Sequence, residues 1–226
     1  MLDERLALAA SLYEPCEWGA DIGTDHAYLP CHLLTSGICR HMIAADVSPG
    51  ALGHARASLT RAGLADRAEI VLADGLEALT HPCGCVSIMG MGGENMADIL
   101  RKGRDRLHGA VLVLSAHTDQ PMVRRCLAEI GYVIVQERLC HAAGRYYVIW
   151  RAEQGPSASS EAEIRYGRLL WKEPAALLTG YVQHRLQVLT GILRGHEAAA
   201  SPDQKAIREL KEDIGFYQHK LEVLSC

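Results

Sequence analysis

The sequence has no strong excess of charge of one sign and no long uninterrupted apolar run. Its 226 residues carry a formal net charge of −4, with an isoelectric point near 6.2. These values argue against a protein that binds nucleic acid through overall basicity, although they allow a local basic patch. The amino terminus has acidic residues and no sustained apolar stretch. We therefore expect no signal peptide and no membrane span, but a soluble, cytoplasmic protein.

Cysteine is not scarce, but it lacks the arrangement of a disulfide scaffold or of a structural zinc site. The cysteines are spread over a chain of ordinary domain size, which favours reduced thiols. The segment His81-Pro82-Cys83-Gly84-Cys85 suggests a metal, yet no second Cys or His pair lies at zinc spacing. A turn entering a strand is the preferred interpretation, and no metal is expected. The eight cysteines are Cys16, Cys31, Cys39, Cys83, Cys85, Cys126, Cys140 and Cys226.

The hydrophobic pattern predicts one α/β domain with an appendage. Only 22% of the residues are charged and 49% are hydrophobic, so the chain should fold. After an amphipathic helix over residues 2–13, continuous apolar strands alternate with helical segments. This alternation indicates a doubly wound parallel sheet covered on both faces. We expect strands at 16–21, 41–46, 68–73, 86–89 and 110–114, with helices at 28–35, 49–61, 93–102 and 120–130.

The end of this domain departs from the alternation. Strand-like residues 132–139 and 145–150 are separated by a turn too short for a helix, so they should pair antiparallel. By fold analogy, such an ending is usual for a Rossmann-like class I methyltransferase and unusual for a nicotinamide-binding domain. We expect a methyltransferase domain over 1–152, a Pro/Gly/Ser-rich linker over 153–160 and a helical unit over 161–226.

The carboxy-terminal unit is predicted to be a helical hairpin, with helices over about 162–172, 174–196 and from Ser201-Pro202 onward. Ser201 is the expected cap of the last helix, with Gln204 completing a capping box. An antiparallel coiled coil is expected, and a dimerising coiled coil is the alternative, so we expect a monomer or weak dimer without an obligate protein partner. The seam residues are Ile207, Leu210, Ile214, Tyr217, Leu221 and Leu224, facing Leu178, Val182, Leu186, Leu189 and Leu193.

Acidic residues end three successive strands. Asp21 ends the first, Asp46 the second and Asp74 the third, and ligands of such folds bind outside these carboxyl ends. Asp46 is placed to accept ribose hydroxyls, and Asp74, beside Gly75, to meet an adenine amino group. For each single aspartate, helix capping is the alternative interpretation.

The turn after Asp21 favours S-adenosylmethionine (SAM) over a dinucleotide. It lacks the Gly-x-Gly-x-x-Gly that seats a pyrophosphate, and SAM has no pyrophosphate. Asp21 and Asp25 suit a cationic sulfonium and amino group. His26 is expected to bind the ligand or order the loop, with capping as the alternative. The glycines of Gly90-Met91-Gly92-Gly93 are expected between cofactor and substrate, or else form only a tight turn.

Three motifs carry a resemblance to a known family. Residues 20–30 (Ala-Asp-Ile-Gly-Thr-Asp-His-Ala-Tyr-Leu-Pro), 74–77 (Asp-Gly-Leu-Glu) and 89–93 (Met-Gly-Met-Gly-Gly) precede a helical hairpin. Together they resemble the TrmK-type bacterial tRNA (adenine-N1)-methyltransferases, which act on the adenine at tRNA position 22. The resemblance covers nearly the whole chain. It implies methyl transfer from SAM to adenine N1, with tRNA as partner.

The resemblance also implies roles for individual residues, and two departures affect them. The family often has a carboxamide and a proline where this chain reads Ser115-Ala116-His117-Thr118, and an alanine in place of Met89. The first departure concerns the contacts to the target base, and the second concerns packing. The implied cofactor residues are Asp21, Gly23, Thr24, Asp25 and His26 in the loop, Asp46 and Val47 at the ribose, Asp74 and Gly75 at the adenine, and Gly90, Met91 and Gly92 beside the methyl group.

The expected chemistry needs alignment more than proton transfer, because the lone pair of adenine N1 is free at neutral pH. The predicted catalytic residues are Asp25, which would stabilise the cationic product, Tyr28, which would form a wall for the extruded base, and Met91 beside the methyl. Tyr146 or Tyr147 would form the opposite wall, unless these rings only pack in the core.

Two other functions stay open at this point: a small-molecule methyltransferase with a helical lid, and a SAM-binding protein without turnover. For the tRNA enzyme, basic residues are needed to hold phosphates. A solvated helix face is the alternative interpretation of the first four candidates. The candidates are Arg101, Lys102, Arg104, Arg106, Arg124, Arg125, Arg138 and Arg145.

Overall fold

The computed structural model describes residues 2–199 and 201–225, so Cys226 lies outside the described residues. The chain forms two compact units that divide between Leu170 and Trp171. The domain limits predicted from the sequence stay a prediction. Within the described residues none of the other cysteines is in a disulfide. Of the helices described, none combines the length and apolarity that crossing a membrane requires.

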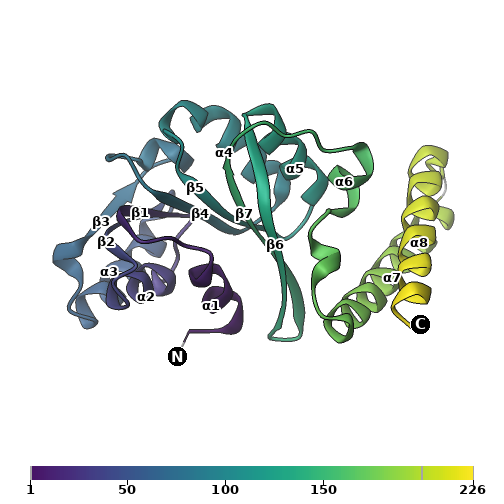
Figure 1. The fold of residues 1–226 in the computed structure, drawn as a ribbon, viewed down its shortest axis with the longest axis horizontal. Coiled ribbons are helices and arrows are strands. Elements are labelled where there is room, and N and C mark those ends of the chain that lie inside the picture. Colours follow the sequence, from purple (N-terminus) through teal and green to yellow (C-terminus); the bar gives the residue numbers. More distant parts are fainter. Residues whose placement is uncertain (1, 200, 226) are drawn as a thin grey trace. The chain divides into compact units, whose positions relative to one another are not determined.

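The first unit is built on a seven-stranded sheet in the order β3-β2-β1-β4-β5-β7-β6 (Figure 1). The first five strands pair in parallel, and β7 adds antiparallel to β5 and β6. This arrangement confirms the predicted Rossmann-like methyltransferase sheet with its closing hairpin. The strands are β1 (Cys16–Ile22), β2 (Cys39–Asp46), β3 (Ala68–Leu72), β4 (Cys85–Met91), β5 (Val111–Ala116), β6 (Tyr132–Ala142) and β7 (Arg145–Gln154).

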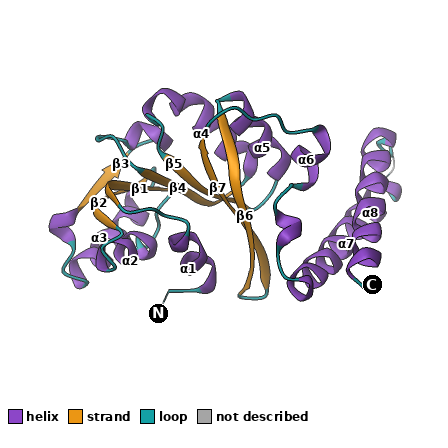
Figure 2. Cartoon of the chain, viewed as in Figure 1, coloured by secondary structure: helices purple, strands orange, loops and turns teal. Residues whose placement is uncertain are grey.

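Helices cover both faces of this sheet (Figure 2). One face packs α1 (Glu4–Ser11), α2 (Tyr28–Thr35) and α3 (Pro49–Arg61), and the other packs α4 (Gly93–Gly103) and α5 (Gln120–Glu129). Helices α2 to α5 each run back from the carboxyl end of one strand to the amino end of the next. The sheet therefore has a carboxyl edge, where α2 to α5 begin, and an amino edge, where they end.

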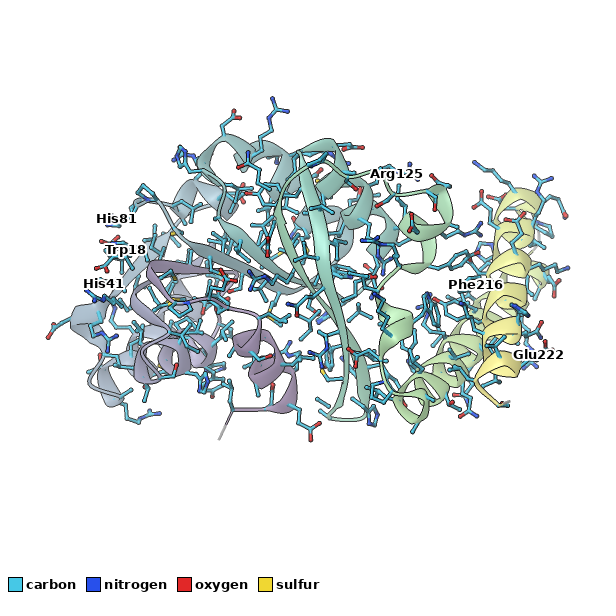
Figure 3. The ribbon with its side chains drawn as sticks, viewed as in Figure 1. Trp18, His41, His81, Arg125, Phe216 and Glu222 are labelled. Carbon is cyan, nitrogen blue, oxygen red and sulfur yellow. The ribbon has the colours of Figure 1, made fainter. Side chains whose placement is uncertain are left out.

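The amino edge carries a stacked cluster of rings. Trp18 lies between His41 and His81, with ring centroids 4.7 and 4.0 Å away (Figure 3). His81 also contacts Glu69, with 2.8 Å between Nε2 and Oε1. As predicted, the segment from His81 to Cys85 is a turn that leads into a strand.

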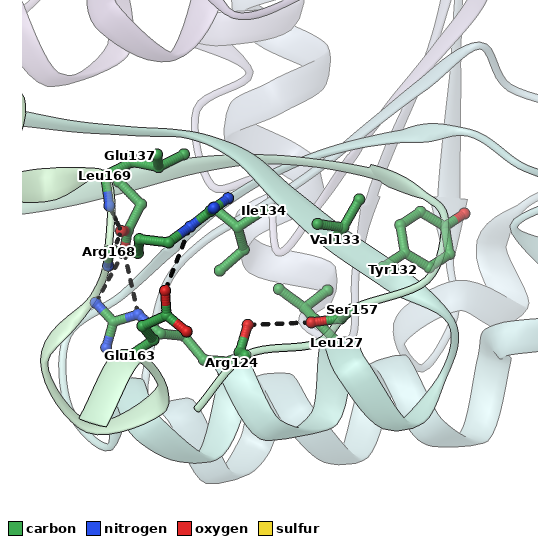
Figure 4. A pocket seen from close by; sticks show the side chains of 11 residues that line it. Arg124, Leu127, Tyr132, Val133, Ile134, Glu137, Ser157, Glu163, Arg168 and Leu169 are labelled. Carbon is green, nitrogen blue, oxygen red and sulfur yellow. Dashed lines mark hydrogen bonds and ion pairs between the residues drawn. The ribbon is translucent and has the colours of Figure 1, made fainter. Parts of the chain in front are cut away.

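A buried carboxylate holds the end of the first unit in place. Glu137 is 3% exposed; its Oε1 accepts from Arg124 Nε at 3.1 Å and from Trp150 Nε1 at 3.0 Å. Its Oε2 accepts three consecutive backbone N–H groups, from residues 168, 169 and 170. Figure 4 shows Glu137 and Arg124 among the residues that line a small pocket of about 30 Å³. The carboxylate therefore fixes the chain just before it leaves the unit.

The helix predicted over 162–172 is shorter in the structure. It is α6 (Glu161–Tyr166), capped by Ser160 with a capping box to Glu163. It ends at Gly167, whose φ of +80° leaves the helical region. A short 3-10 turn over Leu170–Lys172 follows. The hydrogen bonds that residues 168–170 donate to Glu137 replace those that a continuing helix would make.

The second unit is a pair of helices, α7 (Ala175–Glu197) and α8 (Gln204–Leu224), which pack along one another. The predicted cap at Ser201 is wrong: the N-cap of α8 is Asp203, whose Oδ1 accepts from the backbone N–H of Lys205 and Ala206. An aspartate one residue before the helix satisfies two open N–H donors, which places it better than the more distant serine. Trp171 packs edge-on to Phe216, which Figure 3 labels.

Candidate active site

A cavity of about 350 Å³ opens at the carboxyl edge of the sheet. The end of β1, the loop to α2 and the end of β4 form most of its wall, and the amino-terminal segment with α1 closes one side. It is lined by Asp3, Arg5, Leu6, Asp21, Gly23, Thr24, Asp25, His26, Ala27, Tyr28, Leu29, Met89, Gly90 and His117. The loop residues predicted from Asp21 to Tyr28 thus meet around one space.

Asp21 lies at the bottom of this cavity, at the end of a buried hydrogen-bond chain. The Tyr13 hydroxyl donates to Ser87 Oγ at 2.7 Å, and Ser87 Oγ donates to Asp21 Oδ1 at 2.6 Å. Burial raises the pKa of the Asp21 carboxyl above its usual range, although the Ser87 bond and the nearby Arg5 guanidinium lower it in part. A cationic ligand group beside this carboxylate would offset the cost of its burial.

The loop after β1 keeps its shape through backbone contacts. The N–H groups of Gly23 and Thr24 both donate to Ala45 O at 2.9 Å, and Gly23 has a φ of +80°. A side chain at Gly23 would come within 3.1 Å of Met91 Cε. Thr24 is 2% exposed, and its hydroxyl has no hydrogen-bond partner among the described residues, although it lies close enough to Asp21 to lower that carboxyl's pKa.

Three rings stack at the mouth of the cavity. His26 lies between Tyr28, at 5.2 Å with 8° between the planes, and His54 of α3, at 4.7 Å with 4°. The Asp25 carboxylate lies 3.4 Å from His26 Nε2 and 3.3 Å from His54 Nδ1. The ligand atoms of Asp25, His26 and His54 lie within 4.8 Å of one another. Ring lone pairs lie in the ring planes, so parallel rings do not point them at one ion, and the arrangement favours stacking over metal binding.

The end of β4 is irregular at the cavity. Its pairing with β5 shifts register between Met89 and Met91, and Gly90 between them has a φ of +78°. A Cβ on Gly90 would meet no atom within 4 Å, so the backbone borders open space. Gly93 is packed instead, because its Cβ would lie 2.5 Å from two backbone oxygens after β5. The bulge widens the site at Gly90, while Gly93 lets α4 start close to β5.

Six predicted cofactor residues do not line this cavity: Met91 and Gly92 at and just after the end of β4, and four residues near the ends of β2 and β3. Asp46 Oδ1 accepts the Ser48 N–H at 2.7 Å, and Val47 is 66% exposed. Asp74 is exposed, and Gly75 has a φ of +54° with Ile99 2.9 Å from where its Cβ would be. Asp46 ends β2, Val47 follows it, and Asp74 and Gly75 come after β3, all at the same carboxyl edge. Their assignment to the ribose and the adenine stays a prediction.

The amino-terminal helix contributes to the cavity, which its sequence did not predict. Asp3, Arg5 and Leu6 line the cavity. The Arg5 guanidinium lies 5.3 Å from the centroid of the Tyr147 ring, which tilts against His117 at 6.1 Å. Burial lowers the pKa of His117, and Arg5 and Arg145 lower it further. In the sequence, Arg5 is one charged residue on an amphipathic helix, and nothing in the pattern distinguishes it from a solvated side chain.

The predicted basic face needs correction. Arg124 is only 6% exposed and pairs with Glu137, so it cannot reach a phosphate. Arg101 pairs with Glu129 at 3.0 Å. The run from Arg101 to Arg106 spans the last turn of α4 and the short turn after it, at the amino edge and away from the cavity. Arg145 starts β7, and its charge helps to lower the pKa of His117, which lines the cavity.

Comparison with known proteins identifies the family. The family model TrmK, described as tRNA (adenine(22)-N(1))-methyltransferase, matches residues 19–218. The chain belongs to this family. A curated relative, the tRNA (adenine(22)-N(1))-methyltransferase of Bacillus subtilis, is 29% identical over 219 residues, covering 93% of this chain and 92% of the relative. The family predicted from the three motifs is thereby confirmed.

Solved structures of TrmK-like proteins share the fold along nearly the whole chain. The crystal structure of the B. subtilis m1A22 tRNA methyltransferase TrmK has a TM-score of 0.84 at 27% identity, covering 98% of this chain and 99% of that one. A Streptococcus pneumoniae protein in complex with S-adenosyl-L-methionine has a TM-score of 0.86 at 29% identity, covering 98% of this chain and all (100%) of that one. The similarity therefore extends through both units.

Proposed function

We propose that this TrmK-family chain transfers the methyl group of SAM to N1 of adenine 22 in tRNA, using the cavity at the carboxyl edge of its sheet. The observation that carries this proposal is the convergence of Asp21, Thr24, Asp25 and Tyr28 on that cavity. The match to the family model supports the reaction.

The residues present fit the cofactor. The buried Thr24 hydroxyl has no partner in the described part of the chain, and Gly90 leaves open space beside β4. When bound, SAM supplies an electrophilic methyl group on a sulfonium. Asp21 and Thr24 bind the amino acid part, with Asp21 placing its negative charge near the cofactor's amino group. Asp46 and Val47 take the ribose, and Asp74 and Gly75 the adenine, at the carboxyl ends of β2 and β3.

The target base is positioned by two sets of rings. Tyr28, backed by His26, forms one wall, and Tyr147, with Arg5 and His117 beside it, forms the other. Met91 and the neighbouring Gly90 and Gly92 exclude water on the β4 side. The exposed Asp25 carboxylate stabilises the positive charge that the adenine gains on methylation. The chain thus contributes alignment and electrostatics, because N1 needs no base to free its lone pair.

Holding the tRNA falls to the cavity rim and to the helical unit. Arg145 at the start of β7 offers a phosphate contact near the cavity, and Arg138 lies on the neighbouring β6. The α7–α8 pair is the RNA-binding accessory unit. The enzyme acts in the cytoplasm, where tRNA is modified.

Comparing two tRNA transcripts as methyl acceptors tests this function. The protein is incubated with SAM carrying a radioactive methyl group, an unmodified tRNA transcript and a matched transcript with guanine at position 22. We expect label only in the adenine-22 transcript. Equal labelling of both transcripts would place the target elsewhere, and labelling of neither would contradict the tRNA substrate.

A further inference from the structure

Two thiols meet at the amino edge of the sheet, far from the cavity. Cys16 is the first residue of β1 and Cys39 the first of β2, and they are paired in the parallel ladder. Their Sγ atoms lie 3.4 Å apart. Neighbouring strands lie about 4.8 Å apart. A disulfide spans Cα separations of about 4.4–6.8 Å, so the strands need not move for the sulfurs to join.

The pair is enclosed by backbone on two sides. A Cβ at Gly84 would lie 2.6 Å from Cys16 Cβ, and one at Gly19 would lie 2.8 Å from Cys39 Sγ. Glycine at both positions lets the chain pack directly against the two thiols. Cys16 is partly exposed, whereas Cys39 is fully buried at 0% exposure. A small oxidant therefore reaches Cys16 first.

The more exposed thiol, Cys16, is also the more acidic of the two. The hydrogen bond from Cys39 lowers the pKa of Cys16, and the Cys85 backbone N–H lowers it further, against burial and the Glu17 charge. The same bond, together with burial, raises the pKa of Cys39. Burial also raises the pKa of Cys31, Cys83, Cys85 and Cys126. Because the thiolate is the reactive form, Cys16 is the favoured nucleophile of this group.

We propose that Cys16 and Cys39 form a peroxide-reactive dithiol that closes to an intramolecular disulfide. The Cys16 thiolate attacks one oxygen of hydrogen peroxide, the O–O bond breaks, and the leaving hydroxide takes a proton to become water. Cys16 is now a sulfenic acid. The Cys39 sulfur loses its proton and attacks the Cys16 sulfur, and hydroxide leaves with that proton as a second water. Two thiols are oxidised and one peroxide is reduced.

The reaction does not depend on the methyltransferase site. Cys16 and Ile22 mark the two ends of β1, which are about 20 Å apart at ordinary strand rise. Closing the disulfide joins residues 23 positions apart, which restricts the unfolded chain. Oxidation should therefore raise the Tm under non-reducing conditions.

Peptide mapping of the full chain tests the proposal. The protein is treated with hydrogen peroxide, blocked with N-ethylmaleimide and digested. Trypsin is unsuitable, because residues 6–40 contain no Lys or Arg before Arg40, so Cys16, Cys31 and Cys39 stay in one peptide. A glutamate-specific protease does not cut the Glu14–Pro15 bond, but its cuts after Glu4 and Glu17 isolate Cys16 in residues 5–17, and Cys31 and Cys39 in residues 18–69.

We expect these two peptides to be linked in the wild type and in Cys31→Ser, but not in Cys39→Ser. In Cys39→Ser, dimedone should instead label Cys16 as a trapped sulfenic acid. SAM binding by each variant before oxidation controls for misfolding. A link that survives in Cys39→Ser but disappears in Cys31→Ser would overturn the pairing. Links between chains, or oxidation of other cysteines while Cys16 stays reduced, would overturn the proposal.

Discussion

Replacing Tyr28 by alanine should reduce methyl transfer to tRNA without destabilising the fold. The side chain is 56% exposed and stacks on His26 at 5.2 Å, so one face of its ring is free to receive a base. Stacking of a base on an aromatic side chain contributes about 1–3 kcal/mol. Losing it corresponds to a fall of about 5- to 150-fold in kcat/KM for tRNA. An exposed substitution of this kind changes the free energy of unfolding by only about 0.5 kcal/mol.

The assay compares Tyr28→Ala with Tyr28→Phe, which keeps the ring and removes only the hydroxyl. We expect Tyr28→Phe to retain most of the activity, and both variants to bind SAM as the wild type does. Isothermal titration measures SAM affinity, and initial rates over a range of tRNA concentrations give kcat/KM. An unchanged kcat/KM in Tyr28→Ala would refute the stacking role. An equal loss in Tyr28→Phe would assign the effect to the hydroxyl and refute it as well.

Four further predictions follow from the site and the fold. Asp21→Asn should weaken SAM binding about 10- to 100-fold, the value of a hydrogen bond to a charged group. The Tm of this variant at pH 7 should not fall. Because the pKa of Asp21 is raised in the folded protein, the wild-type free energy of unfolding decreases as the pH rises from about 4 through that pKa. Asparagine does not ionise, so the variant does not have this decrease. Glu137→Gln should lose about 3–5 kcal/mol in urea unfolding, because whichever oxygen becomes an NH₂ then faces N–H donors; a change below about 1 kcal/mol would contradict this. Arg145→Ala should weaken tRNA binding and make the negative slope of log binding constant against log salt concentration less steep by about 1. Arg104→Ala at the amino edge should change neither the affinity nor the slope. Ending the chain after Leu170, which keeps the backbone donors to Glu137, should abolish tRNA binding and preserve SAM affinity; unchanged tRNA binding would remove the helical unit from RNA recognition.

Much of the fold follows from local sequence features. The helix of Pro49–Arg61 is bounded as predicted, because Ser48 caps it and Pro49 fits its first turn. The antiparallel hairpin follows from the short turn, where Ala143 and Gly144 have φ values of 49° and 74°. The cap of α8 was misplaced by two residues, because Ser201 and Asp203 are both good caps and only the chain's path chooses between them.

The site could be predicted only where one continuous motif builds it. Residues from Asp21 to Tyr28 meet at the cavity because one loop carries them. Ser87 and Tyr13 support Asp21 from β4 and from the segment after α1, and His54 joins the ring stack from α3. These contacts join residues far apart in the chain, so no local pattern reveals them. Arg124 was mistaken for a surface cation because its partner Glu137 becomes a neighbour only when α5 packs on β6.

The most direct test of the central claim is the identity and position of the methylated nucleoside. Unmodified tRNA with adenine at position 22 is incubated with the protein and SAM, digested to nucleosides and analysed by mass spectrometry, and fragments are mapped to locate the methyl group. We predict N1-methyladenosine at position 22 in stoichiometric yield. Methylation at N6, methylation at another position, or the absence of any methylated adenosine would contradict the account.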